Sequence, residues 1–442
     1  MPTPTDLVTD LPADFEVFGQ AVDSSMADLK GGTTGQILSK ATNTDMDFVW
    51  ITNDQGDITG ITATSPLTGG GTSGAVTVGI QSATTSQSGA VQLSDSTSTT
   101  SSVLAATPTA VKSAYDLANR PNPSNPVINS AFQIWQRGTS VAASAGSSTY
   151  TADRWSILSA GNATTTSRQA TSDTTNLPFI QYCARVQRNA GQTSTQAIYY
   201  GNSFETINSL PFVGKTVTLS YYARAGANYS GASNGLTVVL YSGTGTDQSI
   251  TGTYTGASAV ATSSATLTTT WQRFTATGTV SSSATELAVS PFYTPSGTAG
   301  ANDYFEITGV QIDVGSSALP FRTAGTTYQQ ELAACQRYYW RVNTNSTNTT
   351  TGLYGSAYNT TAAAPGRAAP VTMRVVPTSM DYSNQQLNDF AGTFAVTGVA
   401  LWSGSSTDSL YVLATGATGL TTGRSYGLTA SGTGYIGFSA EL

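Results

Sequence analysis

The pattern of apolar and polar residues changes its period several times along this chain of 442 residues. In residues 10–29 the apolar positions are spaced alternately by four and three, which predicts a helix with an apolar seam on one side. Nothing adjacent in the sequence could bury this seam, so we expect it to pack against copies of itself or to dock on a larger assembly. The alternative is an amphipathic helix that packs on its own chain. The seam positions are Leu11, Phe15, Phe18, Val22, Ser25 and Leu29.

Residues 31–106 contain short runs that alternate in period two and are separated by glycine-rich turns. Residues 36–40 and 47–52 predict a pair of strands, and residues 75–80 place Val76, Val78 and Ile80 on one face of another. A single copy has too few strands to bury this apolar face, whereas three intertwined copies could bury it and leave no free edge. The alternative is a flexible linker, and the periodic valines and isoleucines count against it.

The stretch from Ser88 to Ala118 reads as a short strand, a polar loop and a capped helix. Thr107 is a favourable N-cap, and Pro108 occupies the first helical position, where its missing N–H costs nothing. Such a short helix is marginal in isolation, so its apolar stripe needs a partner. Across both helices, the predicted contacts between chains of a homotrimer are Phe15, Phe18, Val22, Val111 and Tyr115.

Beyond a proline-rich linker at residues 119–126, the chain predicts two β domains. Residues 126–325 contain about nine strand-like runs separated by Gly, Ser and Asn turns, which indicates an antiparallel sandwich with jelly-roll topology. A helix capped by Thr327, with Gln330 completing a capping box, opens a smaller β domain that runs to residue 442. The runs expected in that domain are 339–342, 352–358, 371–374, 394–402, 410–414 and 435–442.

Composition narrows the possible partners. Charged residues make up 10% of the chain, the net charge is −7 and there is no basic cluster. These properties argue against nucleic acid as the main binding partner. No apolar run reaches the length of a membrane span, and the first residues do not resemble a secretory signal. Two cysteines are too few for a disulfide framework, so Cys183 and Cys335 are expected to be buried free thiols. Trp135 and Trp155 are expected in the core of the sandwich.

The chain has no histidine, which excludes Ser-His-Asp and Cys-His nucleophile systems and histidine-based zinc sites. Gly231–Gly235 matches a nucleophile-elbow pattern by chance. No spacing singles out a pair of carboxylates for glycoside hydrolysis, and there is no ligand motif for a calcium ion near Asp303 or Glu306. We therefore expect that the protein is not an enzyme and has no cofactor, and we assign no metal-ligating residues. The carboxylates considered are Glu205, Glu286, Asp303, Glu306 and Asp313.

Several phrases of this sequence resemble bacteriophage tail fibres. They are Asp10–Phe18, the run GTTGQILSKATNTDMDFVWI from Gly32, the run SGAVQLSDSTSTTSSVLAATPTAVKSAYDLA from Ser88, and ELAACQRYYWR from Glu331. The phrases at residues 125–138 and 305–315 resemble the carbohydrate-binding-like domain of such fibres. The resemblance implies a homotrimeric fibre of the virion tail, with an N-terminal anchor at 1–30 docked on baseplate or tail proteins, a shaft at 31–125, a jelly-roll domain at 126–325 and a tip at 326–442.

The resemblance also implies attachment to the host surface, to a polysaccharide or an outer-membrane component, through the C-terminal tip. Aromatic rings bind sugar faces while carboxylates and guanidinium groups take the hydroxyls. Trp402 and Tyr382, in loops bordered by glycine and serine, are the expected stacking residues, with Asp381 and Arg424 as hydroxyl partners. Tyr354 and Tyr358 complete the candidate site. The alternatives are a structural fibre that carries a separate adhesin and a polysaccharide-degrading tailspike.

Overall fold

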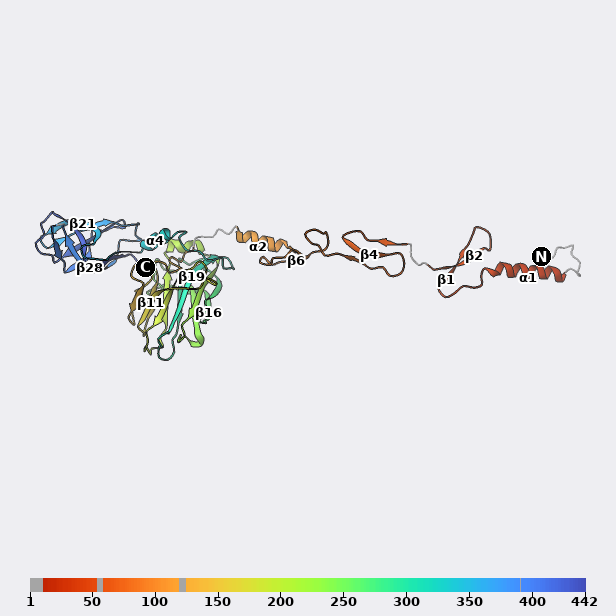
Figure 1. Ribbon diagram of the computed structural model, residues 1–442, viewed down its shortest axis with the longest axis horizontal. Helices are drawn as coiled ribbons and strands as arrows, with labels where there is room; N and C mark the ends of the chain where they lie inside the picture. The colour runs from red at the N-terminus through yellow and green to blue at the C-terminus, as the bar shows by residue number, and fades with distance from the viewer. Residues whose placement is uncertain (1–10, 54–58, 119–124, 390) are drawn as a thin grey trace. The chain divides into compact units, whose positions relative to one another are not determined.

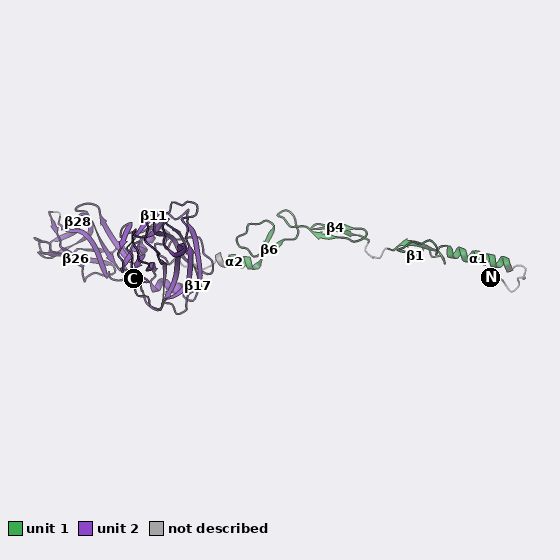
Figure 2. Ribbon diagram, turned by 90° about the horizontal axis from the view of Figure 1, so that it is seen from below, with its two compact units in different colours: residues 1–119 green, residues 120–442 purple. Residues whose placement is uncertain are grey.

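The computed structural model describes residues 11–53, 59–118, 125–389 and 391–442. The chain divides into two compact units, residues 1–119 and residues 120–442, drawn in different colours in Figure 2. The predicted linker at 119–126 lies mostly outside the described residues. Strands dominate the described chain as a whole, and the second unit in particular, which confirms the predicted mainly β class.

The first unit begins with helix α1 (Leu11–Ala27), as predicted, and ends with helix α2 (Pro108–Ala118). Between the two helices lie a β1–β2 hairpin, a three-stranded sheet in the order β3-β4-β5, and the parallel pair β6–β7. Figure 1 labels both helices of this unit and the strands β1, β2, β4 and β6. The strands are β1 (Gln36–Lys40), β2 (Phe48–Thr52), β3 (Ile61–Thr62), β4 (Leu67–Gly71), β5 (Val78–Ile80), β6 (Gln92–Ser94) and β7 (Leu104–Ala106).

The start of α2 is fixed by its cap. The Thr107 hydroxyl accepts a hydrogen bond from the Ala110 N–H at 3.1 Å, and the Thr107 N–H donates to the Ser94 carbonyl at 3.1 Å. The second bond ties the helix to β6, and the β7 residues that pair with β6 lie where the sequence predicted only a polar loop. Ala110 is buried against this small sheet, while Val111 and Tyr115 face outward.

The second unit contains a sandwich of two six-stranded antiparallel sheets, in the orders β16-β15-β18-β13-β10-β9 and β17-β14-β19-β12-β11-β8. The eight strands β12–β19 have jelly-roll connectivity, because the chain crosses between the sheets and pairs first with last, β12 with β19. The strands are β8 (Ser140–Ala143), β9 (Ser148–Tyr150), β10 (Ser156–Ser159), β11 (Thr164–Ala170), β12 (Tyr182–Arg188), β13 (Ile198–Ser203), β14 (Thr216–Ala225), β15 (Gly235–Gly243), β16 (Ser258–Thr266), β17 (Gln272–Thr279), β18 (Glu286–Tyr293) and β19 (Tyr304–Val314).

The sandwich encloses the larger core of the described chain. Trp155 is fully buried, with its ring centroid 4.9 Å from Phe132 and 5.1 Å from Tyr200. Trp135 is also buried, and both cysteines are buried and unpaired, as predicted. The chain forms more strands here than predicted, since β16 is rich in Ser, Thr and Ala and its sequence lacks the large apolar residues of a recognisable strand.

Short helices α3 (Thr206–Ser209), η1 (Leu210–Phe212) and η2 (Ala232–Asn234) lie in loops of the sandwich, and α4 (Tyr328–Gln336) follows it. The Thr327 hydroxyl accepts from the Gln330 N–H at 3.3 Å, which confirms the predicted cap. The return bond of the predicted capping box is displaced by one residue, because Gln330 Oε1 accepts from the Thr326 N–H. The buried side chains of α4 are Glu331 and Cys335, whereas Tyr328 is exposed.

A nine-stranded sheet forms the C-terminal part of the second unit, with the central order β22-β27-β23-β21-β28-β24-β25 and with β20 and β26 on its flanks. The strand predicted at 371–374 is wrong: these residues run irregularly between Pro370 and Pro377, whose missing N–H groups cannot enter a ladder. The strands are β20 (Tyr339–Thr344), β21 (Thr350–Asn359), β22 (Ala362–Ala363), β23 (Gly366–Ala368), β24 (Ser379–Asn388), β25 (Thr393–Ala395), β26 (Gly398–Leu401), β27 (Ser409–Thr415) and β28 (Ser425–Ser439).

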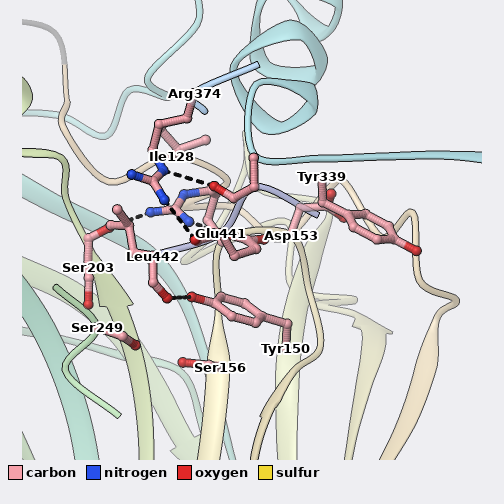
Figure 3. Close-up of polar contacts among 12 residues, drawn as sticks. Ile128, Tyr150, Asp153, Ser156, Ser203, Ser249, Tyr339, Arg374, Glu441 and Leu442 are labelled. Atoms are coloured by element: carbon pink, nitrogen blue, oxygen red, sulfur yellow. Dashed lines mark hydrogen bonds and ion pairs between the residues drawn. The ribbon is translucent and has the colours of Figure 1, made fainter. Parts of the chain in front are cut away.

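The segment after β28 joins this sheet to the sandwich, as Figure 3 shows. The Tyr150 hydroxyl donates to the Leu442 carbonyl at 2.9 Å, and Arg374 donates to the carbonyls of Ala440 and Glu441, each at 2.9 Å. The Glu441 carboxylate forms an ion pair with Arg154, whose side chain is 2% exposed. Within the second unit, the two β parts therefore share buried polar contacts.

Candidate functional site

A line of alternating tyrosines and glycines crosses the C-terminal sheet on the face opposite its apolar core. Tyr354 in β21 is paired with Gly427 in β28 on one side and with Gly366 in β23 on the other. Gly366 is paired in turn with Tyr411 in β27. Residues that are paired in register point to the same face of a sheet, so both tyrosine side chains lie on one face.

Both tyrosine rings lie against the backbone of a neighbouring glycine. A Cβ added at Gly427 would lie 2.8 Å from the Tyr354 ring, and one added at Gly366 would lie 2.2 Å from the Tyr411 ring. The Thr350 hydroxyl donates to the Tyr354 hydroxyl at 3.0 Å, which fixes the direction of that ring. Tyr354 is 46% exposed and Tyr411 is 39% exposed, so the rings remain open to solvent.

Trp402 and Tyr358 extend this aromatic surface. The Trp402 N–H donates to the Tyr411 carbonyl at 3.0 Å, which continues the β26–β27 ladder by one residue beyond Leu401. The Trp402 ring meets Tyr358 edge to face, with centroids 5.7 Å apart, and leaves Tyr358 67% exposed. We call Tyr354, Tyr358, Tyr411 and Trp402 the aromatic row. The row contains three of the residues expected to bind the receptor and adds Tyr411.

The other expected site residues lie elsewhere in the sheet. Tyr382 and Asp381 belong to β24, a strand paired along β28, so the expectation that Tyr382 lies in a loop is wrong. The segment Ser379–Asn388 is mostly polar and carries no β-branched residue, which is why its sequence resembled a loop. Tyr382 pairs with Ile436 and Asn388 pairs with Gly427, so Tyr382 lies six residues along β24 from the level of the Tyr354–Gly427 pair, or about 20 Å at the rise of an extended strand.

Asp381 and Arg424 are both engaged within the protein. The Asp381 carboxylate accepts a hydrogen bond from the Tyr339 hydroxyl at 2.9 Å. Burial raises the pKa of Tyr339, and the nearby Asp381 charge adds to this effect. Arg424 forms an ion pair with Asp389 at 3.0 Å, in the turn that follows β24. Trp402 is half-buried and Tyr382 is 39% exposed.

The acidic residues of the second unit are occupied by structural partners. Glu306 is held by Arg185 and Arg224, Asp303 by Arg188, and Asp313 by Arg322. Burial raises the pKa of Glu286, which accepts the Gln248 N–H at 2.9 Å. Among the described residues, no cluster of three or more acidic, cysteine or histidine side chains is placed to hold a metal ion.

A hollow lies between the α3 and η1 region and α4, and no residue of the aromatic row lines it. Its volume is about 670 Å³, and the Glu205–Arg337 ion pair lies in its wall. Apolar contributions come from Ile207, Phe212 and Tyr338. Sequence reasoning did not identify this hollow, because its walls come from segments more than a hundred residues apart.

Comparison with known protein families finds a match for one segment of the chain. Residues 84–125 match the model of the phage tail fibre repeat, which includes the described elements β6, β7 and α2. The predicted resemblance to tail fibres is confirmed for this segment. No curated protein matches the chain.

Solved structures similar to the chain include several β-sandwich proteins. The match to a CBM4 structure covers 30% of this chain and 71% of the CBM4 chain, with 20% sequence identity and a TM-score of 0.22. The match to the CBM22-1 xylan-binding domain of Paenibacillus barcinonensis Xyn10C covers 45% of this chain and 94% of that domain, with 11% sequence identity and a TM-score of 0.25. The match to the enzymatically active domain of bacteriophage CBA120 tailspike protein 4 covers 43% of this chain and 21% of the tailspike chain, with 14% sequence identity and a TM-score of 0.27. With similarity at this level, the jelly-roll assignment rests on the strand order described above.

Among the described helices, none is long and apolar enough to cross a membrane.

Proposed function

We propose that this chain is a bacteriophage tail fibre protein that attaches the virion to the host surface through its C-terminal sheet. The observation that carries the proposal is the combination of a tail fibre repeat at residues 84–125 with an exposed aromatic row at the far end of the sequence. Aromatic side chains held in a rigid sheet have little structural reason to be exposed, whereas a ligand at the cell surface gives them one. The proposed location of the protein is the phage tail.

The N-terminal residues are proposed to face the virion. The seam of α1 is exposed along its length, with Phe15 62%, Phe18 45% and Val22 38% exposed. Val111 and Tyr115 on α2 are likewise 58% and 63% exposed. Packing in a parallel homotrimer would bury both helices, and three copies of a weak receptor site would give avid attachment. Residues 1–30 are proposed to dock on baseplate or tail proteins.

Attachment without catalysis is the activity that we favour over polysaccharide cleavage. A retaining or inverting glycosidase needs two carboxyl groups that face a shared substrate space. The acidic groups Glu306, Asp303 and Asp313 are instead fully buried and paired with arginines. The aromatic row itself contains no titratable carboxyl or thiol group.

The test is competition for adsorption. Purified full-length protein, added to host cells before the phage, is expected to lower the adsorption rate constant at least tenfold at saturation. The Trp402→Ala variant should melt within a few degrees of the parent and should compete much less well. Failure of the folded parent protein to compete would contradict the proposed function. Competition by a fibre from an unrelated phage serves as the negative control.

A further inference from the structure

We infer that the aromatic row is a stacking platform for an uncharged stretch of polysaccharide that lies across the strands, from Tyr354 past Tyr411 to Trp402. The inference rests on the proposed function and specifies the ligand class and the direction in which the ligand lies. Tyr411 belongs to the site because strand pairing places it on the same face as Tyr354. Gly366 and Gly427 belong to it because the two rings lie against them.

The first argument is the orientation of the rings. Three atoms of the Tyr411 ring, Cδ1, Cε1 and Cγ, lie 2.2–2.7 Å from the Cβ position of Gly366, so the ring lies flat over the backbone. The Tyr354 ring covers Gly427 in the same way, with Cε1 and Cδ1 at 2.8 and 3.0 Å. Each ring therefore turns one face to the sheet and the other to solvent. A flat exposed ring face is the shape that packs on the C–H surface of a sugar.

The second argument is spacing. Tyr354 and Tyr411 lie on strands separated by β23 alone, so their backbones are about 9.6 Å apart, twice the distance between neighbouring strands. Trp402 follows on the next strand, about 4.8 Å further. The three aromatic groups lie along one line, at steps of two strand spacings and one strand spacing, and such a line suits an extended ligand. A linear polysaccharide meets this condition.

The third argument is polarity. No residue of the aromatic row carries a charge, and the tyrosine hydroxyls keep polar atoms among the rings. Gly366 lies between Tyr354 and Tyr411, and Gly427 lies on the other side of Tyr354, so the side chains that a protein interface would bury are missing at both positions. A neutral sugar chain gains stacking contacts and hydroxyl hydrogen bonds on such a surface, while a charged chain finds no fixed counter-charge in the row.

The experiment is affinity electrophoresis of the full chain in native gels. The probes are two soluble preparations from the host strain: O-polysaccharide released from lipopolysaccharide by mild acid, and capsular polysaccharide. Retardation by at least one probe is expected. The Tyr354→Ala/Tyr411→Ala double variant should bind at least tenfold more weakly, and the matching Tyr→Phe double variant should keep most of the affinity because the ring faces remain.

The glycines provide an independent test. Gly366→Ala introduces a Cβ into the space of the Tyr411 ring, so it should tilt that ring and weaken binding severalfold without touching the tyrosines. Gly392→Ala is the matched control, since the added Cβ would lie 4.0 Å from the nearest atom, which belongs to the Phe394 ring. Thermal melting and sedimentation are measured for every variant.

Three results would overturn the inference. They are no retardation by either probe, unchanged retardation of the folded Tyr→Ala double variant, and a lower oligomeric state in that variant, which would make the row an interface between copies. The adsorption test separates this inference from the proposed function. A protein that competes for adsorption but binds neither polysaccharide retains its proposed function and uses a receptor of another class.

Discussion

The two units contain similar apolar residues and place them in opposite environments. In the first unit, Ile80, Leu93 and Val111 are 56%, 63% and 58% exposed. In the second unit, Leu219 and Ile307 are completely buried in the sandwich. The first unit forms sheets of two or three strands, whereas the second closes two sheets of six strands over each other and adds a third of nine.

The comparison shows where each unit obtains its stability. Two or three short strands cannot cover their own apolar face, and an isolated short helix is marginal in water. The second unit removes its apolar side chains from water within one chain. We therefore expect the first unit to depend on other copies of the chain and the second to melt independently of them.

The largest effect should come from charging the apolar seams of the first unit. The variant Phe18→Asp/Val111→Asp should convert a three-copy assembly into single chains of 45.5 kDa, because it would bring three unpaired carboxylates together at each helix. Sedimentation equilibrium measures the mass, and melting of the second unit should stay unchanged.

Gln20→Asp is the matched control for this variant, since Gln20 is an exposed polar residue of α1 that lies off the seam. It adds a negative charge to the same helix and should leave the assembly intact. A parent protein that already sediments as a folded single chain would refute the dependence of the first unit on other copies.

A smaller effect is expected from opening the core of the second unit. Trp155→Ala should lower the free energy of unfolding of this unit by about 3–5 kcal/mol, because it leaves a cavity beside Phe132 and Tyr200. Tyr115→Ala in the first unit should not move this transition, since Tyr115 is 63% exposed in the single chain. Denaturant unfolding monitored by fluorescence gives both values. Equal losses in the two variants would show that the units are not energetically separate.

The smallest of the three effects concerns the Glu205–Arg337 ion pair, whose atoms lie 2.9 and 3.0 Å apart. Burial tends to raise the pKa of Glu205, but hydrogen bonds from Arg337 and Tyr338 outweigh it and hold the pKa below its ordinary value of 4.5. Arg337→Ala should cost about 1–2 kcal/mol, since the Arg337 side chain is 40% exposed and water replaces part of the interaction.

The sign of the pH dependence follows from the lowered pKa. The unfolded chain binds a proton at Glu205 more readily than the folded chain, so this contribution is present above pH 4.5 and is lost as the pH falls through the lowered pKa. In Arg337→Ala the loss of stability between pH 4.5 and 3 should be shallower than in the parent. If the free energy of unfolding changed equally steeply with pH in both proteins, Glu205 would not contribute to the loss of stability in acid.

Local patterns predicted the elements whose signals are local. The spacing of apolar residues gave α1, the Thr107 and Thr327 caps gave the starts of α2 and α4, and alternation gave β12, β14 and β19. These signals lie within a few residues of one another, because a helix or a strand repeats its face every few residues. Strands without such signals, such as β16 and β24, were missed and form because a neighbouring strand pairs with them.

The candidate site shows the same division. Tyr354, Tyr358 and Trp402 could be proposed as site residues from residue type alone. Their association could not, because it depends on the register of β21, β23 and β27, and a shift of one residue would turn every side chain to the opposite face. Tyr411 was not selected as a site residue, since it lies in the uniformly apolar run Leu410–Ala414.

The sequence by itself determined the class of the molecule: a mainly β chain with an N-terminal helical seam, a tail fibre repeat and no histidine chemistry. Those properties follow from composition and short-range periodicity, which need no knowledge of distant contacts. The tertiary structure alone decided which aromatic residues share a surface, that Asp381 is bound by Tyr339 and Arg424 by Asp389, and that glycines lie beneath the rings of Tyr354 and Tyr411. Each of these contacts joins segments distant in sequence, and its geometry is set by strand pairing and the turns between strands, which no local pattern encodes.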